Sequence, residues 1–158
     1  MNYLDYFMII VAKYFIIIPI LLFIFVFIKN INKWKKIFLY AILCVIFVLV
    51  LSFIVSKIYY DARPFVVNNV SPLIPHTPDN GFPSDHTLLA ATVSSIIIPF
   101  SMGLGIISWI ITILIGGARM YAGLHHLIDI IGGIIVPIIS SILAFYLTIL
   151  VLPNKITK

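Results

Sequence analysis

Five long apolar runs, separated by short polar segments, divide the chain. They cover approximately residues 6–28, 37–59, 87–102, 104–121 and 127–152. Because an α-helix rises about 1.5 Å per residue, a run of about 20 apolar residues can cross the hydrocarbon core of a bilayer. The pattern therefore predicts an all-α fold: a polytopic membrane bundle of about five transmembrane helices, forming a single domain over residues 1–158.

The longest polar segment, residues 61–85, joins the second and third runs. Proline has no backbone N–H and interrupts helices, so this segment cannot be helical throughout, and its prolines stiffen it. We expect a proline-rich loop that caps one face of the bundle, with Asp61 and Asp79 on its surface. The prolines are Pro64, Pro72, Pro75, Pro78 and Pro83.

The composition excludes a soluble domain. Of the 158 residues, 63% are hydrophobic and 9% are charged, and the mean hydropathy is +1.22, which leaves too little polar surface for solubility. The net charge of +5 does not indicate nucleic acid binding, because many of the basic residues are in one short loop between apolar runs. These loop residues are Lys29, Lys33, Lys35 and Lys36.

The same lysines predict the orientation in the membrane. With five spans, this loop and a tail that contains Lys155 and Lys158 lie on one side, and positively charged loops stay in the cytoplasm. The opposite, extracytoplasmic face of the cell membrane then receives every acidic residue of the chain. These are Asp5, Asp61, Asp79, Asp85 and Asp129.

Two arginines at this outer face are suited to phosphate binding. Arg63 follows the second run and Arg119 ends the fourth. A planar guanidinium group matches phosphate oxygens with two parallel hydrogen bonds and can stabilise the charge that grows in a transition state. Ser84 precedes the third run, where it can either cap the helix or place backbone amides toward a phosphate.

Two histidines and a carboxylate complete the predicted catalytic group. His125 and Asp129 are four residues apart, so on one helix they share a face and Asp129 can accept the Nδ1 proton of the imidazole. The Nε2 atom is then free to attack phosphorus and form a phosphohistidine. His86, at the start of the third run, can protonate the leaving oxygen and later activate water. His126 points about 100° away on a helix, and we assign it a structural role.

The motif region at residues 57–129 resembles the type 2 phosphatidic acid phosphatase superfamily. The family patterns are K-x6-R-P, P-S-G-H and S-R-x5-H-x3-D. This chain has Arg63-Pro64, then Pro83-Ser84-Asp85-His86, then Arg119, His125 and Asp129 at the family spacing. It departs in three places: Lys57 stands one residue late, Asp85 replaces the glycine and Ala118 replaces the serine.

The Arg-Pro-Phe, Phe-Pro-Ser-Asp-His and Ala-Arg sequences are similar to the bacitracin-resistance-type undecaprenyl-diphosphatase branch. The resemblance implies a membrane hydrolase that converts a polyprenyl diphosphate such as undecaprenyl diphosphate to the monophosphate, without metal or other cofactor. It also implies that Lys57 and Ser84 bind substrate phosphate with the two arginines. Phosphatidylglycerophosphate and phosphatidic acid are the alternative substrates.

Two other kinds of protein use similar residues. A transporter or membrane metalloenzyme could bind a metal through His86, His125, His126 and Asp129, which are good zinc donors. The neighbouring arginines, however, repel a cation and attract an anion. A proton-coupled anion carrier would place its ionisable residues near the bilayer midplane, whereas these residues stand at predicted helix ends.

Overall fold

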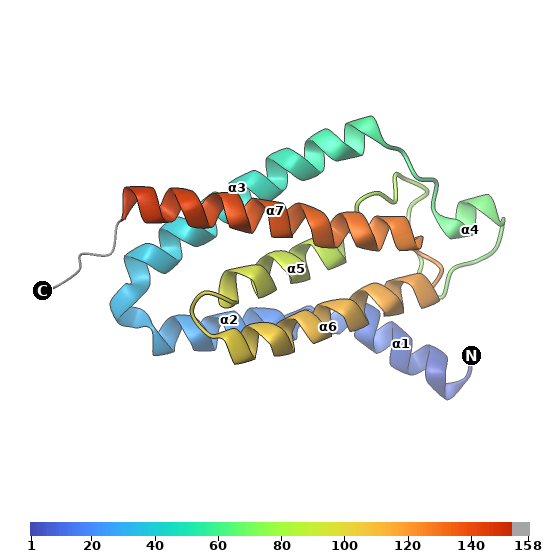
Figure 1. The fold of residues 1–158 in the computed structure, drawn as a ribbon. Helices are drawn as coiled ribbons and strands as arrows, with labels where there is room; N and C mark the ends of the chain where they lie inside the picture. Colours follow the sequence, from blue (N-terminus) through green and yellow to red (C-terminus); the bar gives the residue numbers. More distant parts are fainter. Residues whose placement is uncertain (153–158) are drawn as a thin grey trace, which may run out of the picture.

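The computed structural model describes residues 1–152 and is all-helical over that range (Figure 1). Lys155 and Lys158, which entered the predicted orientation, lie outside the described residues. Within the described range the only β-type pairing is an isolated bridge between Ala62 and Asn80. The helices are α1 (Tyr3–Tyr14), α2 (Ile17–Lys29), the 3-10 helix η1 (Ile31–Lys33), α3 (Trp34–Ile58), α4 (Pro64–Val67), α5 (Asp85–Ile97), α6 (Met102–Tyr121) and α7 (Leu127–Val151).

Three helical segments are long and apolar enough to cross a membrane: Ile31–Ile58, Met102–Tyr121 and Leu127–Val151. The first predicted run is divided into α1 and α2, which meet at an angle of 42° and together could form a fourth span. Pro19 explains this break, because a proline ring clashes with the carbonyl four residues earlier, here that of Phe15. The all-helical, multi-pass architecture is confirmed.

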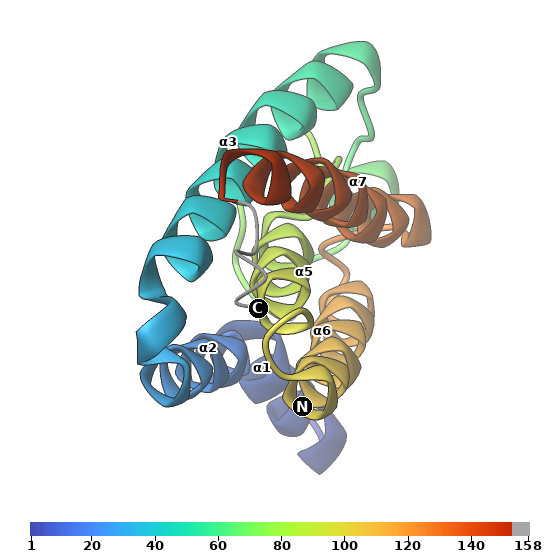
Figure 2. The ribbon, with the colours of Figure 1, turned by 60° about the vertical axis from the view of Figure 1, so that its left-hand side comes forward.

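Helix α5 is shorter than the predicted third span. It has 13 residues, and residues 98–101 form a turn rather than a last helical turn of the run at 87–102. Most of its side chains are buried, because α6 and α7 pack closely against it and α2 and α3 cover its remaining sides (Figure 2). A Cβ atom at Gly133 would lie 3.0 Å from Thr87 Cβ and 3.1 Å from the Ser84 carbonyl oxygen, so this glycine allows α7 to approach α5.

Hydroxyl groups hydrogen-bond inside the bundle between α5 and α6. Ser94 Oγ lies 2.6 Å from Ser108 Oγ and 3.0 Å from Thr112 Oγ1, and all three residues are buried. In a bilayer such groups find no water, so hydrogen bonds between helices satisfy them and fix the helix register. The surfaces of α3, α6 and α7 that face away from α5 expose large apolar side chains instead, as a lipid-facing surface does.

The predicted motif segments and the lysine-rich loop at residues 29–36 lie at opposite ends of the bundle. The loop between α3 and α5, which contains α4, meets the turn between α6 and α7 at one end (Figure 1). The α2–α3 junction, the α5–α6 turn and the carboxyl end of α7 gather at the other end. The fold therefore places the three predicted motif segments together, away from the lysine-rich loop.

Candidate active site

The side chain of Asn80 folds the loop between α3 and α5 back onto the end of α3. Its Oδ1 atom accepts hydrogen bonds from the backbone N–H groups of Asp61 and Phe82, each at 3.0 Å. Its Nδ2 atom donates to the carbonyl oxygens of Ser56 at 3.1 Å and Tyr59 at 3.2 Å. Four backbone groups are thereby satisfied by one amide, and the segment before Arg63 is held beside the segment that leads into α5. The sequence analysis missed Asn80, since a turn-forming asparagine looks the same whether or not it connects two segments.

Helix α5 is joined to the beginning of α7 next to this loop. The backbone N–H of Ser84 donates to the carbonyl oxygen of Asp129 at 3.1 Å. Gly81 approaches the side-chain carboxylate of Asp129 so closely that an added Cβ would lie 2.9 Å from Asp129 Oδ2. A side chain at Gly81 would therefore displace Asp129, which makes this glycine part of the support of the site.

His125 and Asp129 are paired and buried. His125 is 3% exposed and Asp129 is fully buried, and His125 Nδ1 lies 3.2 Å from Asp129 Oδ2. The expectation that both stand on one helix is wrong: His125 precedes α7, His126 is its N-cap residue and Asp129 lies in its first turn. The pair forms because Asp129 Oδ2 also accepts a hydrogen bond from the backbone N–H of His126 at 2.9 Å, which holds the carboxylate beside the N-cap residue of α7 and next to His125.

Arg63 determines the tautomer of His125. Its Nη1 atom lies 3.0 Å from the Leu124 carbonyl oxygen and 3.2 Å from His125 Nε2, while its Nε atom donates to Asp79 Oδ1 at 2.6 Å. A guanidinium group can only donate hydrogen bonds, so His125 Nε2 must be the acceptor. The proton therefore sits on Nδ1, facing Asp129, and Nε2 presents a lone pair.

Arg119 is the second guanidinium of the site. It is 4% exposed, and its buried Nε atom has no hydrogen-bond partner among residues 1–152. The positive charge of Arg63 acts on it, and Asp85 is the neighbouring acidic group. A buried cation without a hydrogen-bonded partner is costly, so this arrangement favours binding of an anion.

His86 lies in the first turn of α5 and is half-buried. It is close enough to Arg119 and His125 for their charges to act on its imidazole. The structure thus gathers Arg63, His86, Arg119, His125 and Asp129, although they come from three separate segments of the chain.

Lys57 and Ser84 are placed differently from these residues. Lys57 is exposed, its Nζ atom lies 5.5 Å from the centre of the Phe53 ring, and it forms no hydrogen bond or ion pair with a site residue in the described part of the chain. Ser84 is fully buried at the N-cap position of α5 but makes no capping hydrogen bond with its side chain; Thr87 Oγ1 donates to its Oγ atom at 3.2 Å. The structure therefore brings Ser84 beside the site and leaves Lys57 outside it.

Asp79 is exposed on the loop, as expected, and Asp61 is partly buried, but both also have specific partners that were not expected. Asp79 pairs with Arg63, and Asp61 Oδ2 lies 2.7 Å from His126 Nδ1. Partial burial raises the pKa of Asp79, but the hydrogen bonds from Arg63 and Thr77 and the charge of Arg63 outweigh it and lower that pKa overall. Nothing in the sequence spacing indicated either pair, because the partners are far apart along the chain.

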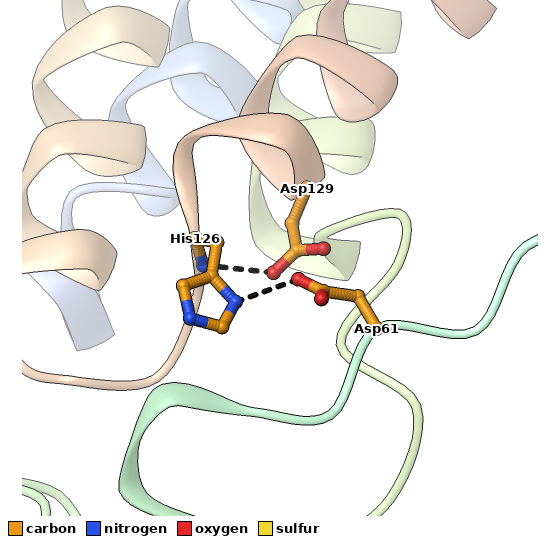
Figure 3. A group of neighbouring side chains, drawn as sticks. All are labelled: Asp61, His126 and Asp129. Atoms are coloured by element: carbon orange, nitrogen blue, oxygen red, sulfur yellow. Dashed lines mark hydrogen bonds and ion pairs between the residues drawn. The ribbon is translucent and has the colours of Figure 1, made fainter. Parts of the chain in front are cut away.

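Asp61, His126 and Asp129 form the one group of possible metal ligands in the described part of the chain (Figure 3). Their ligand atoms lie within 4.8 Å of one another. However, His126 Nδ1 is already bonded to Asp61, and Asp129 Oδ2 faces two donors, the His126 N–H and His125 Nδ1. Arg63 adds a positive charge nearby. These three residues are therefore better explained as a hydrogen-bonded link between the loop and the start of α7 than as a cation site.

A lowered pKa of His125 predicts how activity depends on pH. Burial is the main cause of the lowering, and Arg63 and Arg119 add to it, while the hydrogen bond to Asp129 opposes it. A pKa below the ordinary value of about 6.5 keeps the imidazole neutral at pH 7. If neutral His125 is the reactive form, protonation of His125 is expected to lower kcat/KM only below about pH 6.5.

The measurement is the pH profile of phosphate release, corrected by a titration of the free lipid phosphate so that the ionisation of the substrate is removed. An acid limb centred above pH 6.5 after that correction would contradict the assignment.

Comparisons with known proteins indicate the same family as the motif residues of the site. The family model described as the PAP2 superfamily matches residues 34–151. Undecaprenyl-diphosphatase BcrC of Bacillus subtilis is 32% identical to the chain, over 98% of this chain and 87% of that protein. The bacitracin transport permease protein BcrC of Bacillus licheniformis is 28% identical, over 73% of this chain and 57% of that protein.

Two solved structures share the fold. The crystal structure of Aquifex aeolicus LpxE aligns with a TM-score of 0.67 and 26% identity, and the alignment covers 92% of this chain and 87% of the LpxE chain. The PAP2-type phosphatidylglycerolphosphate phosphatase of Bacillus subtilis aligns with a TM-score of 0.65 and 17% identity, and the alignment covers 98% of this chain and 81% of the phosphatase chain.

Proposed function

The chain belongs to the PAP2 superfamily of membrane lipid phosphatases, and we propose that it hydrolyses a polyprenyl diphosphate, undecaprenyl diphosphate foremost, to the monophosphate and phosphate. The single observation that supports this chemistry best is the position of His125 between Asp129 at Nδ1 and Arg63 at Nε2, each at 3.2 Å. The choice of substrate rests on the similarity to undecaprenyl-diphosphatase BcrC over almost the whole chain.

In the proposed first step, the terminal phosphate binds between Arg63 and Arg119. Its oxygens replace His125 Nε2 as acceptors for Arg63 Nη1, which frees the Nε2 lone pair. Nε2 attacks phosphorus while the bond from phosphorus to the bridging oxygen breaks, and His86 gives its proton to the departing monophosphate. Asp129 stabilises the positive charge that His125 gains.

In the second step, water attacks the phosphohistidine. His86, now neutral, takes a proton from that water, the bond between Nε2 and phosphorus breaks, and inorganic phosphate leaves. His125 returns to the tautomer in which Nδ1 bears the proton. The buried guanidinium of Arg119 balances the phosphate charge in both steps, and no metal is required for either.

A substrate panel tests this proposal. The purified protein, in excess chelator, is supplied with undecaprenyl diphosphate, phosphatidylglycerophosphate or phosphatidic acid at equal surface concentration, and released phosphate is measured. We expect the largest kcat/KM for the diphosphate and no loss on chelation. Faster release from either glycerophospholipid would overturn the substrate, and loss of all activity with chelator would overturn the histidine mechanism.

We further propose that the single domain of residues 1–158 crosses the membrane five times. The bent pair α1–α2 and the helices α3, α6 and α7 form four crossings, and α5 with the turn at 98–101 forms the fifth, surrounded by the others. The lysine-rich loop then faces the cytoplasm and the candidate active site faces outward.

Labelling of intact cells with a membrane-impermeant maleimide tests this topology. Thr77→Cys, in the loop after α4, is expected to react in intact cells, whereas Asn32→Cys, in η1, is expected to react only after permeabilisation. Both positions are exposed or partly exposed, and the native Cys44 is buried, which keeps the background low. The reverse labelling pattern would contradict the orientation.

A further inference from the structure

The guanidinium group of Arg63 is held along one of its two edges. Its Nε atom donates to Asp79 Oδ1 at 2.6 Å, and its Nη2 atom donates to the Asn80 carbonyl oxygen at 3.5 Å. Nε and Nη2 form the side edge of the planar group, whereas Nη1 and Nη2 form its end. Two consecutive loop residues therefore hold the side edge, and Nη1 is directed at His125 Nε2, where the proposed phosphate binds.

The side chain of Asn80 fixes the loop against the backbone that leads into Arg63. Its Oδ1 atom accepts a hydrogen bond from the backbone N–H of Asp61 at 3.0 Å. The next residue, Gly81, donates its N–H to the Asp61 carbonyl oxygen at 2.8 Å, and Ala62 forms an isolated bridge with Asn80. The position of the acceptors that contact the Arg63 side edge therefore depends on this amide.

The same amide caps the end of α3. Asn80 Nδ2 donates to the carbonyl oxygens of Ser56 at 3.1 Å and Tyr59 at 3.2 Å. The last carbonyl groups of an α-helix have no partner within the helix, so a side chain from elsewhere can satisfy them. Since Oδ1 also accepts two backbone N–H groups, both donors and both lone pairs of the amide are used. Aspartate has the same shape but lacks the two donors, and alanine lacks all four groups.

We propose that Asn80 is a positioning residue for phosphate binding. It joins the end of α3 to the loop, so that Asp79 and the Asn80 carbonyl oxygen hold the side edge of Arg63 and leave the end of the guanidinium group for phosphate. The inference rests on the phosphate site of the proposed function. The four hydrogen bonds of the Asn80 side chain go to backbone groups, so its effect on the phosphate passes through Arg63.

A double-mutant cycle between Asn80 and Arg63 tests this route. Asn80→Ala is expected to lower kcat/KM for undecaprenyl diphosphate by about ten- to hundredfold, because a small misplacement of a binding group has effects of this size. In the Arg63→Ala background the guanidinium group is absent, and Asn80→Ala is expected to lower kcat/KM by less than about threefold. A loss of folded protein would lower it by the same factor in both backgrounds, so equal factors would overturn the proposal.

Binding of inorganic phosphate to the purified full-length protein, measured by titration calorimetry, gives a readout that does not depend on the lipid. We expect Asn80→Ala and Asn80→Asp each to weaken phosphate binding about tenfold, because both lose the hydrogen bonds to the end of α3. Asn68→Ala is the matched control. Asn68 is exposed in the same loop, and its side chain makes no hydrogen bond within residues 1–152, so this variant is expected to bind phosphate as the unaltered protein does.

The two measurements separate this inference from the proposed function. Weaker phosphate binding in Arg63→Ala but not in Asn80→Ala would overturn the role of Asn80 and leave the phosphate site intact. Equal phosphate binding by the unaltered protein and Arg63→Ala would overturn both. Weakened phosphate binding in the two Asn80 variants, without hydrolysis of undecaprenyl diphosphate by the unaltered protein, would support the role of Asn80 and overturn the proposed substrate.

Discussion

Replacing His125 with alanine is expected to lower kcat by at least about a thousandfold, because it removes the imidazole proposed to attack phosphorus. The His125 Nε2 atom is directed at Arg63, and its Nδ1 proton faces the buried carboxylate of Asp129. Removing the imidazole deletes the proposed nucleophile and the Nδ1 partner of that carboxylate. The measurement is steady-state phosphate release from undecaprenyl diphosphate by the purified variant.

His126→Ala is the matched control for this experiment. The two histidines are adjacent, but the side chain of His126 bonds to Asp61, and its contact with Asp129 is made by the backbone N–H, which the substitution keeps. We expect kcat to fall by no more than about tenfold, since the substitution removes the hydrogen bond between His126 and Asp61 but no reacting group. If His125→Ala retained more than a tenth of the activity, or if both variants lost the same amount, His125 would not be the nucleophile.

Replacing Asp129 with asparagine is expected to lower kcat by about a hundredfold to ten-thousandfold. The carboxylate is fully buried and lies 3.2 Å from His125 Nδ1, so it would be the counter-charge for the positive charge that His125 gains in the proposed phosphohistidine. The Oδ1 atom of Asp129 has no hydrogen-bond partner in the described structure, so an amide NH2 at that position would be a buried donor without an acceptor.

The pH dependence separates this effect from a change in protonation. Asp129 raises the pKa of His125, so its loss would lower that pKa further and His125 would stay neutral at pH 7. Raising the pH should therefore not rescue Asp129→Asn. Asp79→Asn, which removes a carboxylate that contacts Arg63 and not His125, is the control and is expected to lose about tenfold or less. A kcat for Asp129→Asn within about fivefold of the unaltered protein would refute the role of Asp129.

The sequence predicted the helical, multi-pass fold because long apolar runs leave few other structures in a bilayer. Pro19 and Pro99 indicate breaks in or after two of these runs, but the pattern could not predict that α5 stops at Ile97 or that α1 and α2 separate near Phe15, since apolar residues continue past both boundaries. Runs of this kind indicate which residues lie in the membrane more reliably than where each helix begins and ends.

Arg63, Arg119, His125 and Asp129 could be predicted as a cluster because the motifs that contain them are short segments with a characteristic spacing. Lys57 shows the limit of that reasoning: it stands one residue later than the family pattern has it, and one residue on a helix turns a side chain by about 100°. Because α3 is helical through Ile58, the Lys57 side chain lies against the ring of Phe53, one turn earlier on the same helix.

The contacts that support these residues were not predictable from the pattern. Asn80, the Arg63–Asp79 ion pair and the Asp61–His126 pair all involve the proline-rich loop, where no hydrophobic periodicity exists. They form because the fold brings distant segments together, and only the three-dimensional structure contains that information.

Direct detection of the phosphorylated enzyme tests the central claim, that His125 is the nucleophile of a lipid diphosphatase. The protein is mixed with undecaprenyl diphosphate labelled on its terminal phosphate and quenched within one turnover in alkali, in which phosphohistidine survives. The account predicts label on the peptide that contains His125, loss of that label in acid, and no label in His125→Ala, while His126→Ala is labelled. Phosphate release without any labelled protein, or label on a different residue, would contradict it.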